Sequence, residues 1–205
     1  DHRLAALRLW SGLVLLAFAG THLASHAVGL VSLDAAEVGR LWFLAFWRSL
    51  PGEVALYGSL LLHPALALWR LWRRRGLRLP AVEWLQIGLG ILIPFWLSVH
   101  VLANGVLHRL WGHDDTYAYE LDIIWPGGLV LMTTLVALVW GHGCIGVWRW
   151  LRLKPRAAAA GAPLLALAVL LPVLALLGTV AAGRDFAQRV AADPGWRDRL
   201  AAEQR

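Results

Sequence analysis

Five long apolar stretches alternate with short polar connections along the chain. A helix needs about 20 mostly apolar residues to cross the hydrocarbon core of a bilayer. The five stretches meet this requirement, and the pattern predicts an all-α membrane protein with five transmembrane helices. We expect these spans at residues 7–31, 53–72, 83–107, 126–150 and 161–182.

The segment at residues 34–50 has a different, amphipathic pattern, which is typical of a helix that lies in the membrane interface. Its aromatic residues Trp42, Phe43, Phe46 and Trp47 oppose the charged residues Glu37, Arg40 and Arg48. With this helix included, residues 1–182 form one transmembrane domain. Residues 183–205 are expected to form an extracytoplasmic polar loop or tail.

The composition supports the membrane assignment, because 59% of the residues are hydrophobic and only 16% are charged. A formal net charge of +6 could suggest a nucleic-acid partner, but the basic residues lie in short clusters between apolar runs. Such clusters are typical of membrane topology, and we expect no nucleic-acid binding. Cys144 is the single cysteine, so neither a disulfide nor a thiolate metal site is expected.

The distribution of lysine and arginine predicts the orientation of the spans. Basic residues gather before the first span and in the second and fourth connections, whereas acidic residues dominate the other face. The N-terminus is therefore expected in the cytoplasm and the 183–205 segment outside it. A sixth span after Arg205 would return the chain to the cytoplasm. The basic clusters comprise Arg3, Arg8, Arg70, Arg73, Arg74, Arg75, Arg78, Arg149, Arg152, Lys154 and Arg156.

Five histidines lie within the predicted spans, where an ionisable side chain is costly and usually functional. At about 1.5 Å per residue, His22 and His100 lie roughly 21 and 27 Å above the cytoplasmic helix ends, and His63 and His142 roughly 15 and 10 Å. Two levels result, with one pair of histidines at each. Because a haem iron can be held by two neutral imidazoles from opposite sides, the pattern predicts two haems across the bilayer.

Several alternatives remain open at this point. His26 lies one helical turn from His22 and at the depth of His100, so geometry does not choose between His22 and His26. His22 and His26 could also bind zinc or copper, although no third ligand is apparent. The buried histidines could instead join helices through polar networks or relay protons, but no mid-span acid accompanies them. His108 and His113, beside Asp114 and Asp115, are expected in a solvated outer loop.

The histidine-bearing segments RLWSGLVLLAFAGTHLASH, SLPGEVALYGSLLLHPALALW, QIGLGILIPFWLSVHVL and GHGCIGVW resemble the cytochrome b subunits of dihaem succinate dehydrogenases and fumarate reductases. The resemblance covers most of the chain, from about Arg8 to Gly178. It implies that His22 and His100 hold the iron of an outer haem b, and that His63 and His142 hold the iron of an inner one. It favours His22 over His26.

A narrower resemblance is to the membrane anchors of bacterial class III adenylate cyclases. The segments THLASHAVGLVSLDAAE, WGHGCIGVWRWLRLKP and LALAVLLPVLALLGTVAAGRDFAQ carry it. It implies a homodimer in the bacterial inner membrane, a missing sixth span, a C-terminal cytoplasmic cyclase and, in some members, a [2Fe–2S] domain. The anchor would sense the redox state of the quinone pool and catalyse nothing beyond electron transfer. The alternative is a cytochrome b subunit of a succinate:quinone or fumarate reductase complex.

Overall fold

The computed structural model describes residues 2–74, 76, 78–102, 110, 115–154 and 161–202. Every regular element in these residues is a helix. The elements are α1 (His2–Ala27), η1 (Val28–Leu30), α2 (Leu33–Trp47), α3 (Leu50–Trp72), α4 (Ala81–Val101), α6 (Tyr117–Ile124), α7 (Leu129–Leu151), α8 (Gly161–Ala192) and α9 (Gly195–Ala202).

Five of these helical segments are long and apolar enough to cross a membrane, namely α1 with η1, α3, α4, α7 and α8. This confirms the all-helical fold and the five spans, and the chain is accordingly a multi-pass membrane protein. The expected end of the third span at residue 107 lies outside the described residues, in which α4 ends at Val101. Large apolar side chains such as Leu61, Phe95 and Val130 are exposed along these helices, as expected for surfaces that face lipid.

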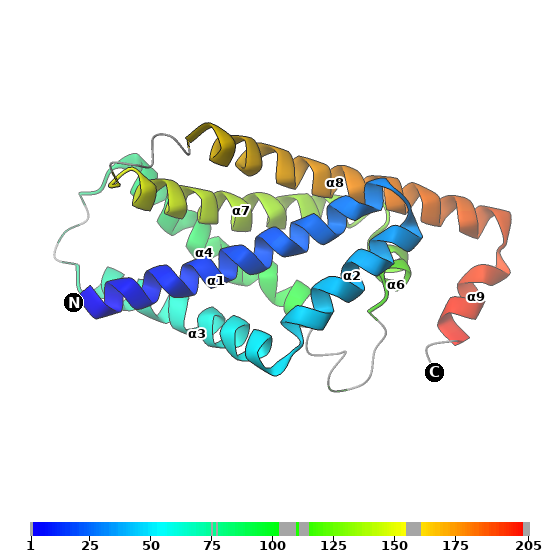
Figure 1. Ribbon diagram of the computed structural model, residues 1–205, viewed down its shortest axis with the longest axis horizontal. Helices are drawn as coiled ribbons and strands as arrows, with labels where there is room; N and C mark the ends of the chain where they lie inside the picture. Colours follow the sequence, from blue (N-terminus) through cyan, green and yellow to red (C-terminus); the bar gives the residue numbers. More distant parts are fainter. Residues whose placement is uncertain are drawn as a thin grey trace.

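The long helices run along a common direction (Figure 1). The N-terminus, the end of α3 and the end of α7 lie at one end of the bundle, and α2, α6 and α9 lie at the opposite end. We call these the inner and outer ends. Consecutive spans joined by short connections run in opposite directions, so every second connection lies at the same end of the bundle. The basic residues of the N-terminus and of the second and fourth connections are therefore at the inner end.

Polar residues begin the short outer helices. The Ser32 hydroxyl accepts a hydrogen bond from the Ala35 amide at 3.0 Å at the start of α2. Thr116 caps α6 in the same way, through the Tyr119 amide at 3.4 Å. Each cap satisfies an amide that the first helical turn leaves without an intrahelical partner. The chain therefore turns from a long span into a short helix at a defined residue.

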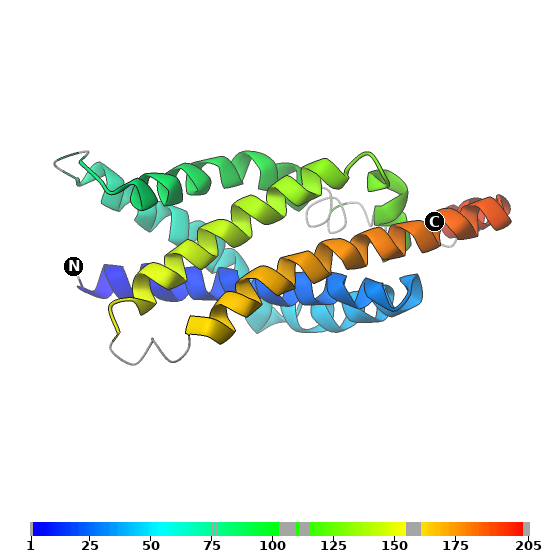
Figure 2. The same ribbon diagram turned by 90° about the horizontal axis from the view of Figure 1, so that it is seen from above.

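The bundle is built from two similar halves. In the first half α1 packs along α3, with α2 between them in sequence; in the second, α4 packs along α7, with α6 between them. The halves meet where α7 contacts α1 and where α2 contacts α6. The fifth span, α8, packs along α1 and extends past its outer end (Figures 1 and 2).

The two halves also repeat a sequence pattern. A glycine is followed ten residues later by a histidine in α1 and in α4, and a histidine is followed by Trp-Arg and a second arginine in α3 and in α7. The equivalent residues are Gly12 and Gly90, His22 and His100, His63 and His142, Trp69 and Trp148, Arg70 and Arg149, and Arg73 and Arg152. All four histidines thus occupy matching positions in two copies of one helical unit.

The described part of the segment after residue 182, where a polar loop or tail was expected, is helical: α8 continues to Ala192 and α9 follows. Phe186 is buried with Leu33 and Tyr117 in an outer core. The buried face of α8 therefore extends past residue 182, the expected end of the fifth span. The polar residues stabilise the same contact. The Asp185 carboxylate accepts a hydrogen bond from the Leu33 amide at 3.0 Å, and Arg189 pairs with Asp185 across one helical turn.

Candidate functional site

The inner histidines, His63 of α3 and His142 of α7, face each other between the two halves of the bundle. Their ring centroids are 6.2 Å apart and their planes are nearly perpendicular, at 89°. The sequence placed these two residues at the same level from helix rise alone, and the structure brings them together. The space between the rings is therefore bounded by one imidazole from each half.

Both inner imidazoles are oriented by a backbone carbonyl of the neighbouring helix. The Nδ1 atom of His63 lies 3.0 Å from the Arg8 carbonyl oxygen, and that of His142 lies 3.0 Å from the Gln86 carbonyl oxygen. A carbonyl only accepts, so each Nδ1 carries the proton and donates it. Each Nε2 then keeps its lone pair. This is the arrangement of metal-ligating histidines, whose second ring N–H is usually held by a carbonyl or carboxylate.

Two glycines allow the rings to reach these carbonyls. A Cβ atom on Gly12 would lie 2.8 Å from Cε1 of His63, and one on Gly90 would lie 3.0 Å from Cε1 of His142. Each glycine stands four residues after the residue whose carbonyl accepts the bond, which places it on the same helix face. Any larger residue at Gly12 or Gly90 would push the imidazole away from its acceptor.

The outer histidines, His22 of α1 and His100 of α4, also face each other across the halves, with ring centroids 5.8 Å apart. Aromatic rings surround His22: Phe18 stacks on it at 5.8 Å and Phe43 of α2 lies 5.0 Å away. The His22 Nδ1 atom is buried without a hydrogen-bond partner among the described residues. Such an orphaned nitrogen in an apolar surrounding is costly unless a further group uses it.

His26 lies beside the outer pair and has partners of its own. Its Nδ1 atom is 2.8 Å from the Tyr117 hydroxyl, and its Nε2 atom is 3.3 Å from Nε2 of His22. Burial raises the pKa of the Tyr117 phenol to about 12, so this hydroxyl stays protonated. The structure therefore pairs His22 with His100 and gives His26 a separate bond to α6, while the choice of ligand stays a prediction.

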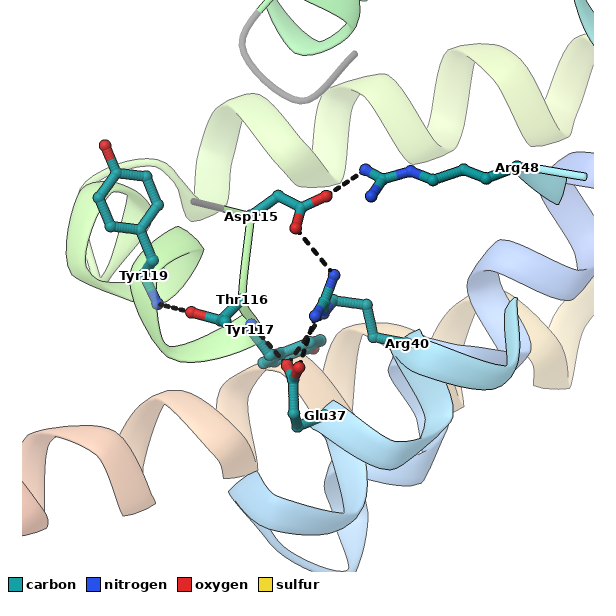
Figure 3. Close-up of polar contacts among 7 residues, drawn as sticks. All are labelled: Glu37, Arg40, Arg48, Asp115, Thr116, Tyr117 and Tyr119. Carbon is teal, nitrogen blue, oxygen red and sulfur yellow. Dashed lines mark hydrogen bonds and ion pairs between the residues drawn. The ribbon is translucent and has the colours of Figure 1, made fainter. Parts of the chain in front are cut away.

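The Tyr117 hydroxyl provides a test of how His26 is held. We expect Tyr117→Phe to leave a buried His26 nitrogen without its partner and to lower the free energy of unfolding by about 1–3 kcal/mol. Thermal unfolding in detergent or nanodiscs measures this loss. Tyr119→Phe is the matched control, because the Tyr119 hydroxyl points away from the other labelled polar side chains (Figure 3). Equal unfolding temperatures for both variants would contradict the assigned hydrogen bond.

An ion-pair network joins α2 to the start of α6 (Figure 3). Arg40 pairs with Glu37 at 2.5 Å and with Asp115 at 3.0 Å, and Arg48 also pairs with Asp115. The Tyr117 amide donates to the Glu37 carboxylate at 2.8 Å. Asp115 is thus not part of a solvated loop, as the sequence suggested, but holds α2 and α6 together. His108, His113 and Asp114 lie outside the described residues.

The separation of both pairs fits two imidazoles that hold one metal ion between them. Metal–imidazole bonds of about 2 Å on each side place the two ring centroids about 6 Å apart. The measured separations are 6.2 Å for the inner pair and 5.8 Å for the outer pair. A haem iron needs only two axial protein ligands, because the porphyrin supplies the other four nitrogens. The facing histidines at each level therefore fit one haem, and at the inner level the glycines and carbonyls also orient them.

A metal held by protein side chains alone fits less well. Zinc sites use three or four protein ligands. Within the part of the chain that the structure describes, no group of three or more histidine, cysteine, aspartate or glutamate side chains could hold a metal ion. The described residues therefore provide no third ligand for a zinc or copper ion at His22 and His26.

The sequence predicted that the four histidines form two pairs, but it did not reveal the groups that orient the inner pair. The signal was available as the repeated spacing of Gly12 to His22 and of Gly90 to His100. The function of these glycines can be recognised only in the structure, where His63 of α3 lies against Gly12 and His142 of α7 lies against Gly90. Searches against known protein families, curated proteins and solved structures find no match to this chain.

Proposed function

We propose that the chain is a dihaem b membrane anchor that exchanges electrons with the quinone pool. The observation that carries this proposal is the pair of facing imidazoles at each of two levels, with ring centroids 6.2 and 5.8 Å apart. His63 and His142 would hold the inner haem, and His22 and His100 the outer one, with His26 as the alternative to His22. A bound haem b supplies one-electron chemistry, so two haems match the two electrons that a quinol releases with two protons.

The residues of the chain orient the ligands and exclude water. The Arg8 and Gln86 carbonyls hold the inner imidazoles in the tautomer that leaves Nε2 free. Phe18 and Phe43 form an apolar wall beside His22. The low dielectric constant of such surroundings disfavours extra charge on an imidazole, which keeps it in the neutral form that binds a metal.

We further propose that this anchor is the redox-sensing receptor of a class III adenylate cyclase in the bacterial inner membrane, with an inner, cytoplasmic N-terminus. The close packing of α8 against the outer site supports this role. A Cβ atom on Gly29 would lie 2.5 Å from the Gly178 carbonyl oxygen of α8, and a Cβ atom on Gly178 would clash with the carbonyl oxygen of His26. A change at the outer histidines would therefore reach the helix that leads to the C-terminal end of the chain.

Quinol-dependent reduction tests the electron-transfer part of this proposal. Anaerobic addition of a quinol analogue to the purified, oxidised chain should produce the α band of reduced b-type haem, and an added quinone should reverse it. Dithionite provides the control for full reduction. Haem that dithionite reduces but no quinol reduces would contradict exchange with the quinone pool.

The cyclase role has its own test in the longer protein. A chain that continues beyond Arg205 into a cyclase should form cyclic AMP at a rate that follows the quinol-to-quinone ratio, and His100→Ala should abolish that dependence. A cyclase rate independent of the ratio would refute the sensor. A chain that functions beside flavoprotein and iron–sulfur subunits would instead support a succinate:quinone or fumarate reductase.

A further inference from the structure

Two histidines of α1 direct the same ring nitrogen toward nearly the same point. His22 and His26 stand one helical turn apart on one face of the helix. Their ring centroids are 4.6 Å apart, but their Nε2 atoms are only 3.3 Å apart. Because these nitrogens are closer together than the ring centres, each imidazole turns its Nε2 edge toward the other.

A metal ion bound to one of these nitrogens stays within reach of the other. A metal–imidazole bond is about 2 Å long, so an ion on one Nε2 atom lies at most about 5 Å from the other. A change of side-chain rotamer is sufficient to cover this distance. His100 faces His22 with ring centroids 5.8 Å apart, and it would supply the imidazole on the opposite side in either case.

The outer level therefore has three histidines for two axial positions. The inner level has only His63 and His142, and no other histidine stands one turn away from either of them. In α4 the residue one turn after His100 is Asn104, so the additional histidine belongs to the first half of the bundle alone. When two outer histidines hold an iron, a third is left beside them.

His22 and His26 each have one property of an axial ligand that the other lacks. His22 faces His100 at the separation of two imidazoles that share a metal ion, but its buried Nδ1 atom has no hydrogen-bond partner among the described residues. The Nδ1 atom of His26 does have a partner, the Tyr117 hydroxyl, at 2.8 Å. A neighbouring group usually holds the second nitrogen of a metal-ligating imidazole, as at both inner histidines. The facing geometry thus favours His22, and the hydrogen bond favours His26.

We propose that His22 and His26 are interchangeable axial ligands of the outer haem, an assignment that rests on the proposed function. His100 stays the ligand on the opposite side. The exchange breaks one iron–Nε2 bond and forms another. Both imidazoles are neutral and carry their proton on Nδ1 before and after the exchange, so neither a proton nor an electron is transferred.

The choice of ligand reaches two other helices through His26. Its side chain bonds to Tyr117 of α6, and its backbone carbonyl packs so closely on Gly178 of α8 that a Cβ atom there would clash with it. His22 lies instead against Phe43 of α2, with ring centroids 5.0 Å apart. Ligation by His26 therefore ties the iron to α6 and α8, and ligation by His22 ties it to α2. The proposed sensor gains two states that differ in these ties.

The haem content of single and double variants tests the exchange. His22→Ala and His26→Ala should each retain two low-spin haems per chain, because the remaining histidine occupies the axial position. The double variant should retain only the inner haem, which also shows that the bundle is folded. His63→Ala is the matched control: it has no replacement one turn away, so this single substitution should remove one haem. Pyridine haemochrome analysis and electron paramagnetic resonance measure both quantities.

The midpoint potential of the outer haem provides a second readout. A hydrogen bond from Nδ1 makes an imidazole a stronger electron donor, which stabilises oxidised iron. The potential should therefore be lower in the His22→Ala protein, where His26 is the ligand, than in the His26→Ala protein. Addition of Tyr117→Phe should raise the potential in the His22→Ala protein and leave it unchanged in the His26→Ala protein.

The outcomes separate this proposal from the proposed function. Loss of the outer haem in either single variant would overturn the exchange and leave the dihaem anchor standing with one fixed ligand. Two haems in the double variant, or the same response to Tyr117→Phe in both single variants, would also overturn it. Failure of the unsubstituted chain to bind haem at all would overturn both proposals.

Discussion

Replacement of His142 by alanine is expected to reduce the haem content of the chain from two to one. The inner pair faces across the bundle with ring centroids 6.2 Å apart, so after the loss of His142 only His63 would remain to hold the proposed inner haem. A porphyrin bound through one side only loses both an iron–nitrogen bond and the contact that ties the second half of the bundle to it. The outer haem should remain, because His22 and His100 belong to another level about 15 Å away along α1.

The comparison of variants makes this prediction specific. His100→Ala should also leave one haem, in this case the inner one. Its spectrum and midpoint potential should therefore be those that the His142→Ala protein lacks. His2→Ala is the control, because His2 is exposed at the start of α1, and it should retain both haems. Two haems in the His142→Ala protein, determined as pyridine haemochrome per chain, would refute the inner-pair assignment.

Substitution of Gly90 by valine should have a similarly large effect without touching a ligand. A Cβ atom at Gly90 would lie 3.0 Å from Cε1 of His142, and the two γ-carbons of valine would crowd the ring further. His142 would lose the Gln86 carbonyl, which fixes its tautomer and orientation. Loss of a group that orients a metal ligand typically weakens metal binding about 10–100-fold. We therefore expect most of the inner haem to be lost on purification.

Gly88 provides the matched control on the same helix. A Cβ atom there meets no atom within 4 Å, so Gly88→Val changes helix propensity to the same extent but leaves His142 in place. It should retain two haems. In the other half, Gly12→Val should repeat the effect through His63, with Gly58→Val as its control. Equal haem content in the Gly90 and Gly88 variants would show that the glycine does not position the imidazole.

The spans and the histidine pairing could be predicted from the sequence because both depend on simple periodic rules. Apolar length identifies a membrane helix, and helix rise places His63 and His142 at one level without knowledge of packing. The sequence also predicted that the basic clusters share one end of the bundle, and the N-terminus and the ends of α3 and α7 do lie together (Figure 1). Each of these inferences depends on the sequence of single helices and not on how the helices pack.

The contacts that orient the ligands could not be predicted in this way. The role of Gly12 depends on which helix packs against α1, and the residues around Gly12 do not predict that this helix is α3. The helical structure of the segment after residue 182 could not be predicted for a related reason. Asp185 and Arg189 appear as polar tail residues in sequence, but they form ties to Leu33 and Asp34 at the start of α2, so α8 continues where a tail was expected. Charged residues in tertiary ion pairs are indistinguishable from solvated ones in a single sequence.

We propose that the chain binds two haems, each between one histidine of the first half of the bundle and one of the second. The most direct test is haem quantification and electron paramagnetic resonance on the purified, unsubstituted chain. We expect two b-type haems per chain, both six-coordinate and low-spin, as two imidazole ligands require. A chain that purifies folded without haem, or with a single high-spin haem, would contradict it.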